Sequence, residues 1–261
     1  MPSHRQTLPR LGQIVIFFIS DLHLTANRPA TVHRFLNFLA TRANEADAVY
    51  ILGDLFDAYI GDDNPAWPFD AIRQSIRRLT DQGTRVFVQQ GNRDFLLGAR
   101  FGKETGATLL GDYAIINLYG TLTLLTHGDL LCTDDVQYQS ARQRIRTKAW
   151  KAHALSRPLW MRQLYARWYR FRSGRNKSAK SREIMDVNQD SVIETMRQHA
   201  VTRLIHGHTH RPAVHEFTVD GQAAQRFVLP EWAGQEWVLR WDEDGYQQEV
   251  VMDLNVPSIG A

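Results

Sequence analysis

The sequence predicts an α/β fold of two packed mixed sheets flanked by helices, with an inserted helical cap. Strand-like apolar runs alternate with helical segments over residues 14–89, and this alternation favours parallel pairing. Short alternating segments fill residues 213–254 and predict antiparallel strands. With 261 residues, 43% of them hydrophobic, the chain is long enough for one large core with an insertion.

Each strand is predicted from a short apolar run rich in β-branched and aromatic residues. The runs are residues 14–19, 48–52, 85–89, 114–118, 122–126 and 203–206. The fourth and fifth runs are close together in the chain and predict a hairpin. Helices are predicted from apolar residues at helical spacing. They are residues 29–44, 69–82 and 183–198.

A strongly basic segment interrupts this pattern between Val136 and Arg182. It contains fourteen of the 31 Lys and Arg residues and no Asp or Glu, so the other 17 basic residues accompany all 28 acidic ones. Residues 138–171 have a helical pattern rich in aromatic side chains, broken at Pro158, and residues 172–181 predict a loop. A cationic segment of this kind favours an anionic partner.

The chain is therefore expected to have three parts. They are a flexible leader at 1–13, a core made of 14–135 and 183–254, and a helical cap at 136–182. The single cysteine, Cys132, excludes a disulfide within the chain and a cysteine-based zinc site, and it favours a reducing compartment. No apolar run approaches the roughly 20 residues that span a bilayer, and the polar start lacks the pattern of a signal peptide, so we expect a cytoplasmic protein. The sequence leaves the oligomeric state open.

Residues that commonly bind metals follow the predicted strands. They occur in Asp21-Leu22-His23, Gly53-Asp54, Gly91-Asn92-Arg93-Asp94, His127-Gly128-Asp129 and His206-Gly207-His208-Thr209-His210. Loops at the carboxyl ends of strands in an α/β sheet converge on one crevice, so these side chains are expected to meet. Oxygen and imidazole ligands without thiolate suit manganese, iron or zinc better than calcium. Each motif alone also fits a turn, but together they predict a metal centre.

This set of motifs resembles the pattern of the calcineurin-like metallophosphoesterase superfamily: Asp-x-His, Gly-Asp, Gly-Asn, His and Gly-His-x-His. The resemblance implies two metal ions. The first would be bound by Asp21, His23, Asp54 and His210, and the second by Asp54, Asn92, His127 and His208. Asp54 would bridge them. Two such ions, about 3.5–4 Å apart, can share a hydroxide that attacks phosphorus and can stabilise the charge that develops.

Two carboxylates and one guanidinium lie next to these ligands in the sequence. Asp94 and Asp129 either orient a ligand side chain or cap a turn, and the sequence favours neither role. Many members of the superfamily have histidine at the position of Arg93. A guanidinium does not donate its proton at neutral pH, but it can clamp a phosphate oxygen.

Longer motifs resemble one branch of the superfamily, the UDP-2,3-diacylglucosamine hydrolases of lipid A biosynthesis, over roughly residues 14–217. They are residues 51–56, 60–63, 91–98, 127–129, 132–135, 184–188 and 205–215. Around Pro230-Glu231 the chain departs from the branch, which has Gly and then a small or acidic residue before the tryptophan.

The resemblance to this branch implies hydrolysis of UDP-2,3-diacylglucosamine to UMP and 2,3-diacylglucosamine 1-phosphate, with attack on the phosphorus nearer uridine. It also implies Mn²⁺ as the usual ion and peripheral association with the cytoplasmic face of the inner membrane. The implied catalytic residues are Asp54, Asn92, Arg93 and His127. The implied substrate contacts are Asn92, Arg93, Asp135, Ser173, Lys177, Lys180 and His208.

The aromatic residues of the basic segment allow two interpretations. They could form an apolar groove for acyl chains and meet an anionic membrane surface, or they could simply pack the cap onto the core. A dimetal nucleotide phosphodiesterase or a nuclease is the alternative enzyme. Because the cationic residues are interleaved with bulky apolar ones, a lipid is favoured and no nucleic acid partner is expected. A binding protein on an inactive scaffold is the alternative without catalysis, but every ligand position is filled.

Overall fold

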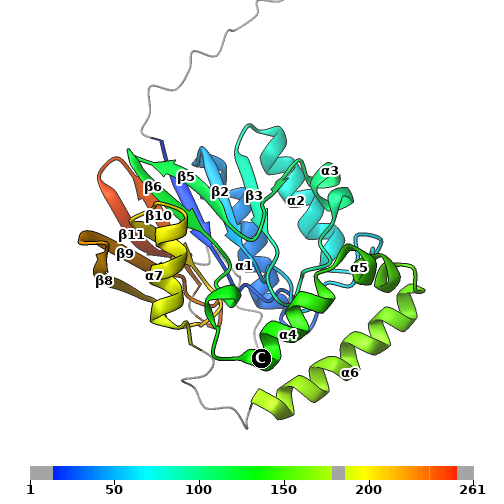
Figure 1. The fold of residues 1–261 in the computed structure, drawn as a ribbon. Coiled ribbons are helices and arrows are strands. Elements are labelled where there is room, and N and C mark those ends of the chain that lie inside the picture. Colours follow the sequence, from blue (N-terminus) through cyan, green and yellow to red (C-terminus); the bar gives the residue numbers. More distant parts are fainter. Residues whose placement is uncertain (1–13, 178–185, 235, 252–261) are drawn as a thin grey trace, which may run out of the picture.

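The computed structural model describes residues 14–177, 186–234 and 236–251, and for residues 169–177 it describes the backbone alone. The predicted leader at 1–13 therefore lies outside the described residues. Two mixed sheets pack face to face, and helices cover their outer faces (Figure 1). This is the α/β arrangement that the sequence predicts.

The first sheet has six strands and the second has five. The order in the first is β11 (Gly245–Val250), β10 (Trp237–Asp242), β1 (Ile16–Ile19), β2 (Ala48–Leu52), β3 (Arg85–Gln89) and β4 (Thr108–Leu109). The order in the second is β5 (Ala114–Leu118), β6 (Thr121–Leu125), β7 (Arg203–His206), β9 (Gln222–Val228) and β8 (Ala213–Val219). Strands β1 to β4 are parallel, and so are β6, β7 and β9.

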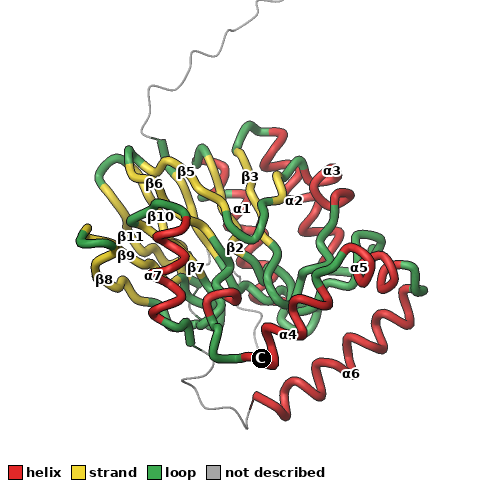
Figure 2. Tube along the Cα trace, viewed as in Figure 1, coloured by secondary structure: helices red, strands yellow, loops and turns green. Residues whose placement is uncertain are grey.

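The helices form two outer layers and a separate group. The first layer, on the six-stranded sheet, consists of α1 (Pro29–Ala40), α2 (Phe69–Asp81) and α3 (Ala99–Thr105). Helix α7 (Gln189–Gln198) covers the five-stranded sheet. The separate group consists of α4 (Val136–Ile145), α5 (Lys148–Leu155) and α6 (Leu159–Lys177) (Figure 2). Two 3₁₀ turns, Ala43–Glu45 and Asp129–Leu131, complete the described helical elements.

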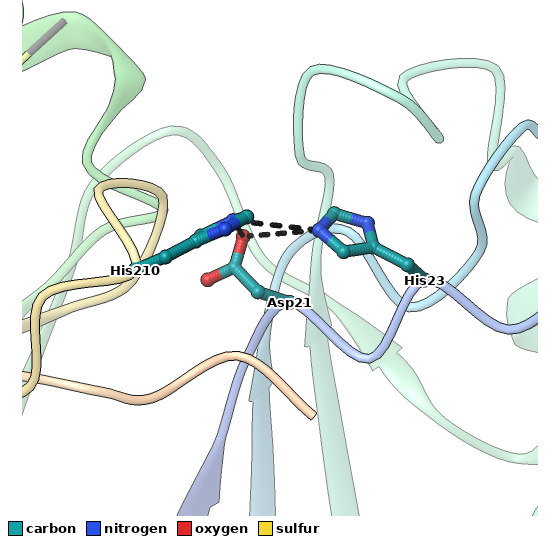
Figure 3. Close-up of side chains that lie close together, drawn as sticks. All are labelled: Asp21, His23 and His210. Carbon is teal, nitrogen blue, oxygen red and sulfur yellow. Dashed lines mark hydrogen bonds and ion pairs between the residues drawn. The ribbon is translucent and has the colours of Figure 1, made fainter. Parts of the chain in front are cut away.

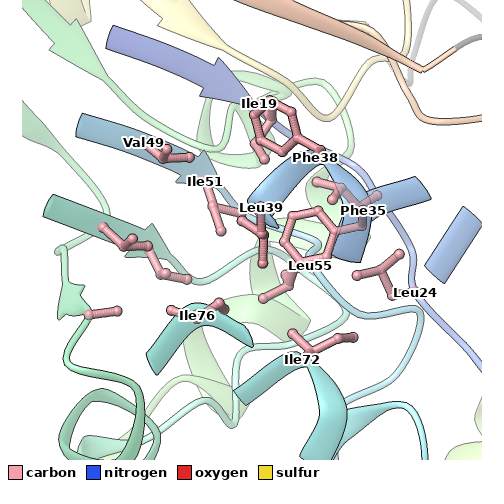
Figure 4. Close-up of a cluster of buried hydrophobic side chains, with 14 of the residues drawn as sticks. Ile19, Leu24, Phe35, Phe38, Leu39, Val49, Ile51, Leu55, Ile72 and Ile76 are labelled. Carbon is pink, nitrogen blue, oxygen red and sulfur yellow. The ribbon is translucent and has the colours of Figure 1, made fainter. Parts of the chain in front are cut away.

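Alternation along β2 shows how one strand serves two layers of the core. Side chains of successive residues in a strand point to opposite faces. Val49 and Ile51 join the cluster beneath α1 and α2 (Figure 4), while Ala48, Tyr50 and Leu52 join the cluster between the two sheets. Both faces of β2 are therefore buried, which explains its uninterrupted apolar sequence.

The sequence locates most elements, and four strands, at 48–52, 85–89, 114–118 and 203–206, are confirmed to the residue. The prediction of a loop at 172–181 is wrong for residues 172–177, because α6 continues as one helix to Lys177 (Figure 2). A glycine such as Gly174 costs a helix only about 1 kcal/mol, so it does not have to end one. The helix predicted over 183–198 begins at Gln189 instead, because the Asn188 side chain caps it by accepting from the Ser191 amide at 3.1 Å.

The tail of the chain contains one further correction. The hairpins β8–β9 and β10–β11 are antiparallel, as predicted, but β9 pairs with β7 in parallel. The carboxyl end of β9 therefore lies at the same edge of the sheet as the carboxyl end of β7. Among the described residues, no helix has both the length and the apolarity needed to cross a membrane.

Candidate active site

Five parallel strand ends bring the predicted ligands together. Asp21 and His23 follow β1, Asp54 follows β2, and Asn92 follows β3. In the second sheet His127 follows β6, and His208 and His210 follow β7. Main-chain hydrogen bonds join these loops. They run from the Asp21 amide to Gly53 O at 3.1 Å, from the His23 amide to Asp54 O at 3.0 Å, and from the Gly207 amide to His127 O at 3.0 Å.

One group of ligands consists of Asp21, His23 and His210 (Figure 3). His210 Nε2 lies 3.3 Å from Asp21 Oδ1 and 3.4 Å from His23 Nε2. His23 Nε2 lies 3.9 Å from Asp21 Oδ1. Three potential ligand atoms from two different strand ends therefore converge, as the binding of one cation requires.

A second group consists of Asn92, His127 and His208. Asn92 Oδ1 lies 3.0 Å from His127 Nε2 and 3.0 Å from His208 Nδ1. The His127 and His208 rings meet edge to face, with centroids 5.0 Å apart. An amide oxygen and two imidazoles again present their ligand atoms to one point.

Asp54 lies between the two groups. Its Oδ2 is 3.8 Å from His23 Nδ1, and its Oδ1 is 3.9 Å from His127 Nε2. The Arg93 amide donates to Asp54 Oδ1 at 2.8 Å, which fixes the carboxylate. One buried carboxylate thus faces an imidazole of each group, the arrangement that a carboxylate shared by two ions needs.

The backbone of the site is strained at its ligands. Five ligand residues other than glycine have positive φ, and these are Asp21 (56°), His23 (49°), Asp54 (52°), His208 (70°) and His210 (56°). Left-handed backbone at such residues is uncommon, costs energy and persists where the surroundings over-determine it. Strain concentrated at one cluster is typical of a functional site.

Glycines allow the loops to pass close to these side chains. A Cβ on Gly91 would lie 2.1 Å from Asp54 Oδ1, and a Cβ on Gly53, whose φ is +89°, would lie 2.5 Å from His127 Nδ1. Both positions are therefore closed to any larger residue. Glycine, which has no Cβ, allows this close approach of the backbone.

The electrostatics of the cluster fit a divalent cation. Asp21 and Asp54 are almost completely buried, and burial raises the pKa of Asp54 despite the nearby His127. Burial also lowers the pKa of His23 to about 3 and that of His208 to about 4, so both imidazoles are neutral and available as ligands. Two buried carboxylates side by side are costly without a compensating positive charge.

One unpartnered atom supports the same conclusion. Within the described part of the chain, His23 Nδ1 is buried and makes no hydrogen bond. Buried polar groups without partners are rare, and this nitrogen lies 3.8 Å from Oδ2 of Asp54, the carboxylate between the two groups. The donor set of carboxylates, imidazoles and an amide suits a divalent transition metal. The residues present therefore fit the two-metal centre that the family resemblance implies.

Arg93 lies at the edge of this cluster. Its Nε is 3.7 Å from Asp54 Oδ2, and its Nη1 donates to Asp57 Oδ1. The side chain is 27% exposed, so the guanidinium borders both the carboxylates and solvent. Asp57 is a partner that the sequence motifs do not reveal.

Asp94 and Asp129, which the sequence left with two possible roles, differ in the structure. Asp94 Oδ1 accepts from the Gly91 amide at 2.7 Å, so it holds the turn that carries Asn92. Asp129 Oδ2 instead accepts from Tyr138 Oη at 2.5 Å and from Arg142 Nε at 2.7 Å. Asp129 therefore connects the loop of His127 to α4.

Helix α4 is joined to the site by further contacts. Arg146 donates from Nη2 to Gly91 O at 2.8 Å, and its guanidinium carbon lies 5.6 Å from the centre of the Phe95 ring. The Tyr138 ring stacks on His208, with centroids 6.3 Å apart. Asp135, a predicted substrate contact, caps α4 by accepting from the Tyr138 amide at 3.1 Å. The basic segment thus starts directly against the ligand loops.

The remaining predicted contacts lie farther along the basic segment. Ser173 and Lys177 belong to α6, where the structure describes the backbone alone, and Lys180 lies outside the described residues. One residue beside the ligands was not predicted. Glu231 Oε2 is 2.7 Å from His210 Nδ1. The signal that could have identified it is the parallel β9, whose end delivers residues 229–232 to this edge.

Comparison with known proteins agrees with this geometry. A family model described as calcineurin-like phosphoesterase matches residues 14–212. The chain belongs to this family. It is also 47% identical over 235 residues to a UDP-2,3-diacylglucosamine hydrolase of Ectopseudomonas mendocina, covering 90% of this chain and 97% of the relative. A protein of the same name from Escherichia coli O7:K1 is 48% identical over 215 residues, covering 82% and 90%.

The chain is therefore a member of the UDP-2,3-diacylglucosamine hydrolase branch of calcineurin-like phosphoesterases, and the predicted family and fold class are confirmed. Among solved structures, Yfce, a phosphoesterase from E. coli, matches with 17% identity and a TM-score of 0.47, covering 93% of this chain and 96% of that one.

Proposed function

We propose that this protein hydrolyses the pyrophosphate bond of UDP-2,3-diacylglucosamine, giving UMP and 2,3-diacylglucosamine 1-phosphate in lipid A biosynthesis. The observation that carries the proposal is the position of Asp54, whose two carboxylate oxygens face His23 and His127, one from each ligand group. The names of the relatives favour this substrate over a nucleic acid or a simple phosphodiester.

Two divalent ions would be bound by the two ligand groups, with Asp54 shared, and we propose that they are Mn²⁺. When bound, such ions supply Lewis acidity to phosphate oxygens and lower the pKa of a coordinated water. Neutral imidazoles at His23 and His208 support this assignment, because a protonated ring cannot bind a metal.

Arg93 is proposed to bind a phosphate oxygen of the substrate. Its guanidinium is always charged and offers several donors in one plane, which suits a phosphate. Its position between Asp54 and solvent supports this role. Asp57, which pairs with Arg93, would keep the guanidinium near the ligands before the substrate arrives.

Residues 136–182 are proposed to form a cap that binds the acyl chains. Trp160, Leu164 and Trp168 recur every fourth residue on α6, so they share one helix face. These side chains are 64%, 62% and 52% exposed, respectively. Together they form a large exposed apolar surface, which is unusual on a folded domain. A substrate with two acyl chains would bury this face. The proposed polar contacts of the same substrate are Asn92, Arg93, Asp135, Ser173, Lys177, Lys180 and His208.

The same segment supports peripheral binding to an anionic membrane. It has an excess of Lys and Arg and exposed Trp, and this combination favours the surface of an anionic bilayer. We propose that the protein acts on the cytoplasmic face of the inner membrane, where it would meet a lipid-linked nucleotide substrate.

A comparison of substrates tests the function. Turnover of UDP-2,3-diacylglucosamine with Mn²⁺ is measured beside that of bis-p-nitrophenyl phosphate and single-stranded DNA. We expect release of UMP with a kcat/KM at least about a thousand-fold above the others, since remote binding energy of the acyl chains contributes to catalysis. Preference for either of the other substrates would reject the lipid assignment.

A further inference from the structure

Glu231 contacts the ligand residues of the first group from outside. Its Oε2 lies 2.7 Å from His210 Nδ1, and its Oε1 lies 3.9 Å from His23 Nε2. The other ring nitrogen of His210, Nε2, faces Asp21 Oδ1 at 3.3 Å. The His210 ring is thus held at one edge by Glu231, while its opposite edge faces the ligand cluster.

We propose that Glu231 is a positioning residue for the first metal ion, acting through His210; this inference rests on the proposed function. The Glu231 carboxylate accepts the Nδ1 proton of His210. That hydrogen bond leaves Nε2 unprotonated and directed at the ion, and it makes the ring a stronger ligand.

Main-chain hydrogen bonds hold the backbone on both sides of Glu231. The Leu229 amide donates to His206 O at 2.7 Å, and the Trp232 amide donates to Asp21 O at 3.2 Å. Trp232 is completely buried and packs edge to face against Phe35 and Phe38. Glu231 is therefore anchored to the ends of β7 and β1, the two strands that supply Asp21, His23 and His210.

Charge distinguishes the two ligand groups. Around the first group Glu231 adds a carboxylate to Asp21 and Asp54. In the second group His127 is oriented by a main-chain carbonyl, since its Nδ1 lies 2.9 Å from Leu52 O. This main-chain carbonyl carries no net charge, and a side-chain substitution does not remove it. Loss of the Glu231 carboxylate should therefore weaken the binding of one ion and leave the affinity for the other unchanged.

The test is a titration of metal-stripped, full-length protein with Mn²⁺, followed by isothermal calorimetry and by the EPR signal of free Mn²⁺. Glu231→Gln keeps an acceptor but loses the charge, and Glu231→Ala loses both. We expect one of two Mn²⁺ sites to weaken about 10-fold in Glu231→Gln and up to about 100-fold in Glu231→Ala. The second site should bind as in the unaltered protein.

Glu216→Gln is the matched control. Glu216 is an exposed glutamate on β8, away from the ligand loops, and its substitution should leave both affinities unchanged. The melting temperature of metal-free protein should be similar in all variants, which separates a role in metal binding from a role in folding. Excess Mn²⁺ should restore turnover in Glu231→Ala.

Two results would overturn the inference. One is equal Mn²⁺ affinity in Glu231→Ala and Glu216→Gln, and the other is a loss of turnover that excess Mn²⁺ does not restore. Failure of the proposed function looks different, because unaltered protein would then bind Mn²⁺ but leave UDP-2,3-diacylglucosamine intact.

Discussion

The ligand cluster and helix α6 differ in burial and in how firmly neighbouring residues fix them. Asp21 and Asp54 are buried, are fixed by neighbouring loops and have a strained backbone. Helix α6 instead exposes Trp160, Leu164 and Trp168. The core thus fixes the proposed reacting groups, whereas the surface that we propose for the acyl chains is exposed to solvent.

The two regions also differ in how they are attached. Helix α4 is joined to the cluster through Asp129, Arg142 and Arg146. Near the start of α6, the buried Arg162 donates to Ile60 O at 2.6 Å and to Asp63 Oδ1 at 2.8 Å. The basic segment is thus attached to the core through α4 and the start of α6, and α5 adds a hydrogen bond from Lys151 Nζ to Gln90 Oε1 at 2.9 Å. Substitutions should become less severe from the cluster through α4 to the exposed face of α6.

The largest effect is expected at Asp54. Asp54→Ala removes the carboxylate that faces both ligand groups, so we expect kcat to fall at least about 10³-fold, together with loss of bound metal. Steady-state turnover and metal analysis measure these effects. Asp54→Asn should fail similarly while keeping the shape of the side chain.

Asp70→Asn, at an exposed position in the first turn of α2, is the control for this pair. Circular dichroism should show that all three variants are folded. Turnover near that of the unaltered protein in Asp54→Ala would contradict the assignment of Asp54 to both ions.

An intermediate effect is expected where α4 meets the cluster. Arg142→Met leaves the buried Asp129 with fewer partners, and breaking a buried pair costs about 3 kcal/mol or more. Urea unfolding should therefore show lower stability. Arg144→Met is the matched control, since Arg144 is exposed on the same helix. Equal stability of the two variants would show that this ion pair does not stabilise the fold.

The same pair gives a pH dependence with a definite sign. Burial works to raise the pKa of Asp129, but His127 and Arg142 outweigh it and hold that pKa well below its ordinary value. A carboxyl with a lowered pKa stabilises the fold above its unfolded pKa of about 3.9, and this contribution is lost as pH falls below that value. The stability difference between Arg142→Met and the unaltered protein should therefore shrink in acid.

The smallest effect is expected on the exposed face of α6. Replacing Trp160, Leu164 and Trp168 by Ser should raise KM for the diacylated substrate about 10-fold. This corresponds to about 1.4 kcal/mol in total, less than one fully buried apolar side chain contributes, because a bound acyl chain would cover only part of each side chain. KM for a deacylated analogue should be unchanged. Ile115→Ser with Leu122→Ser, at exposed apolar positions of the second sheet, is the control. An equal rise for both substrates would mean that α6 does not bind the acyl chains.

The sequence predicts that the ligand side chains converge because each follows a recognisable strand, and four of the five motifs also contain a glycine. The sequence does not predict the position of Glu231, since this residue follows β9, a strand whose parallel pairing with β7 depends on tertiary structure. The Asp129–Arg142 pair is not predicted for the same reason, as thirteen residues separate its members and their contact depends on how α4 turns back. Helix ends were the least predictable, because Gly174 permits a helix that the sequence alone would end.

The left-handed backbone at five ligand residues couples metal supply to survival of the fold. In an unfolded chain these residues relax and their side chains scatter, so ions bind the folded form far more tightly. An ion present at a hundred times its dissociation constant adds about 2.7 kcal/mol to the free energy of unfolding. Depletion of the metal should therefore lower the free energy of unfolding of this protein, in addition to emptying its proposed active site.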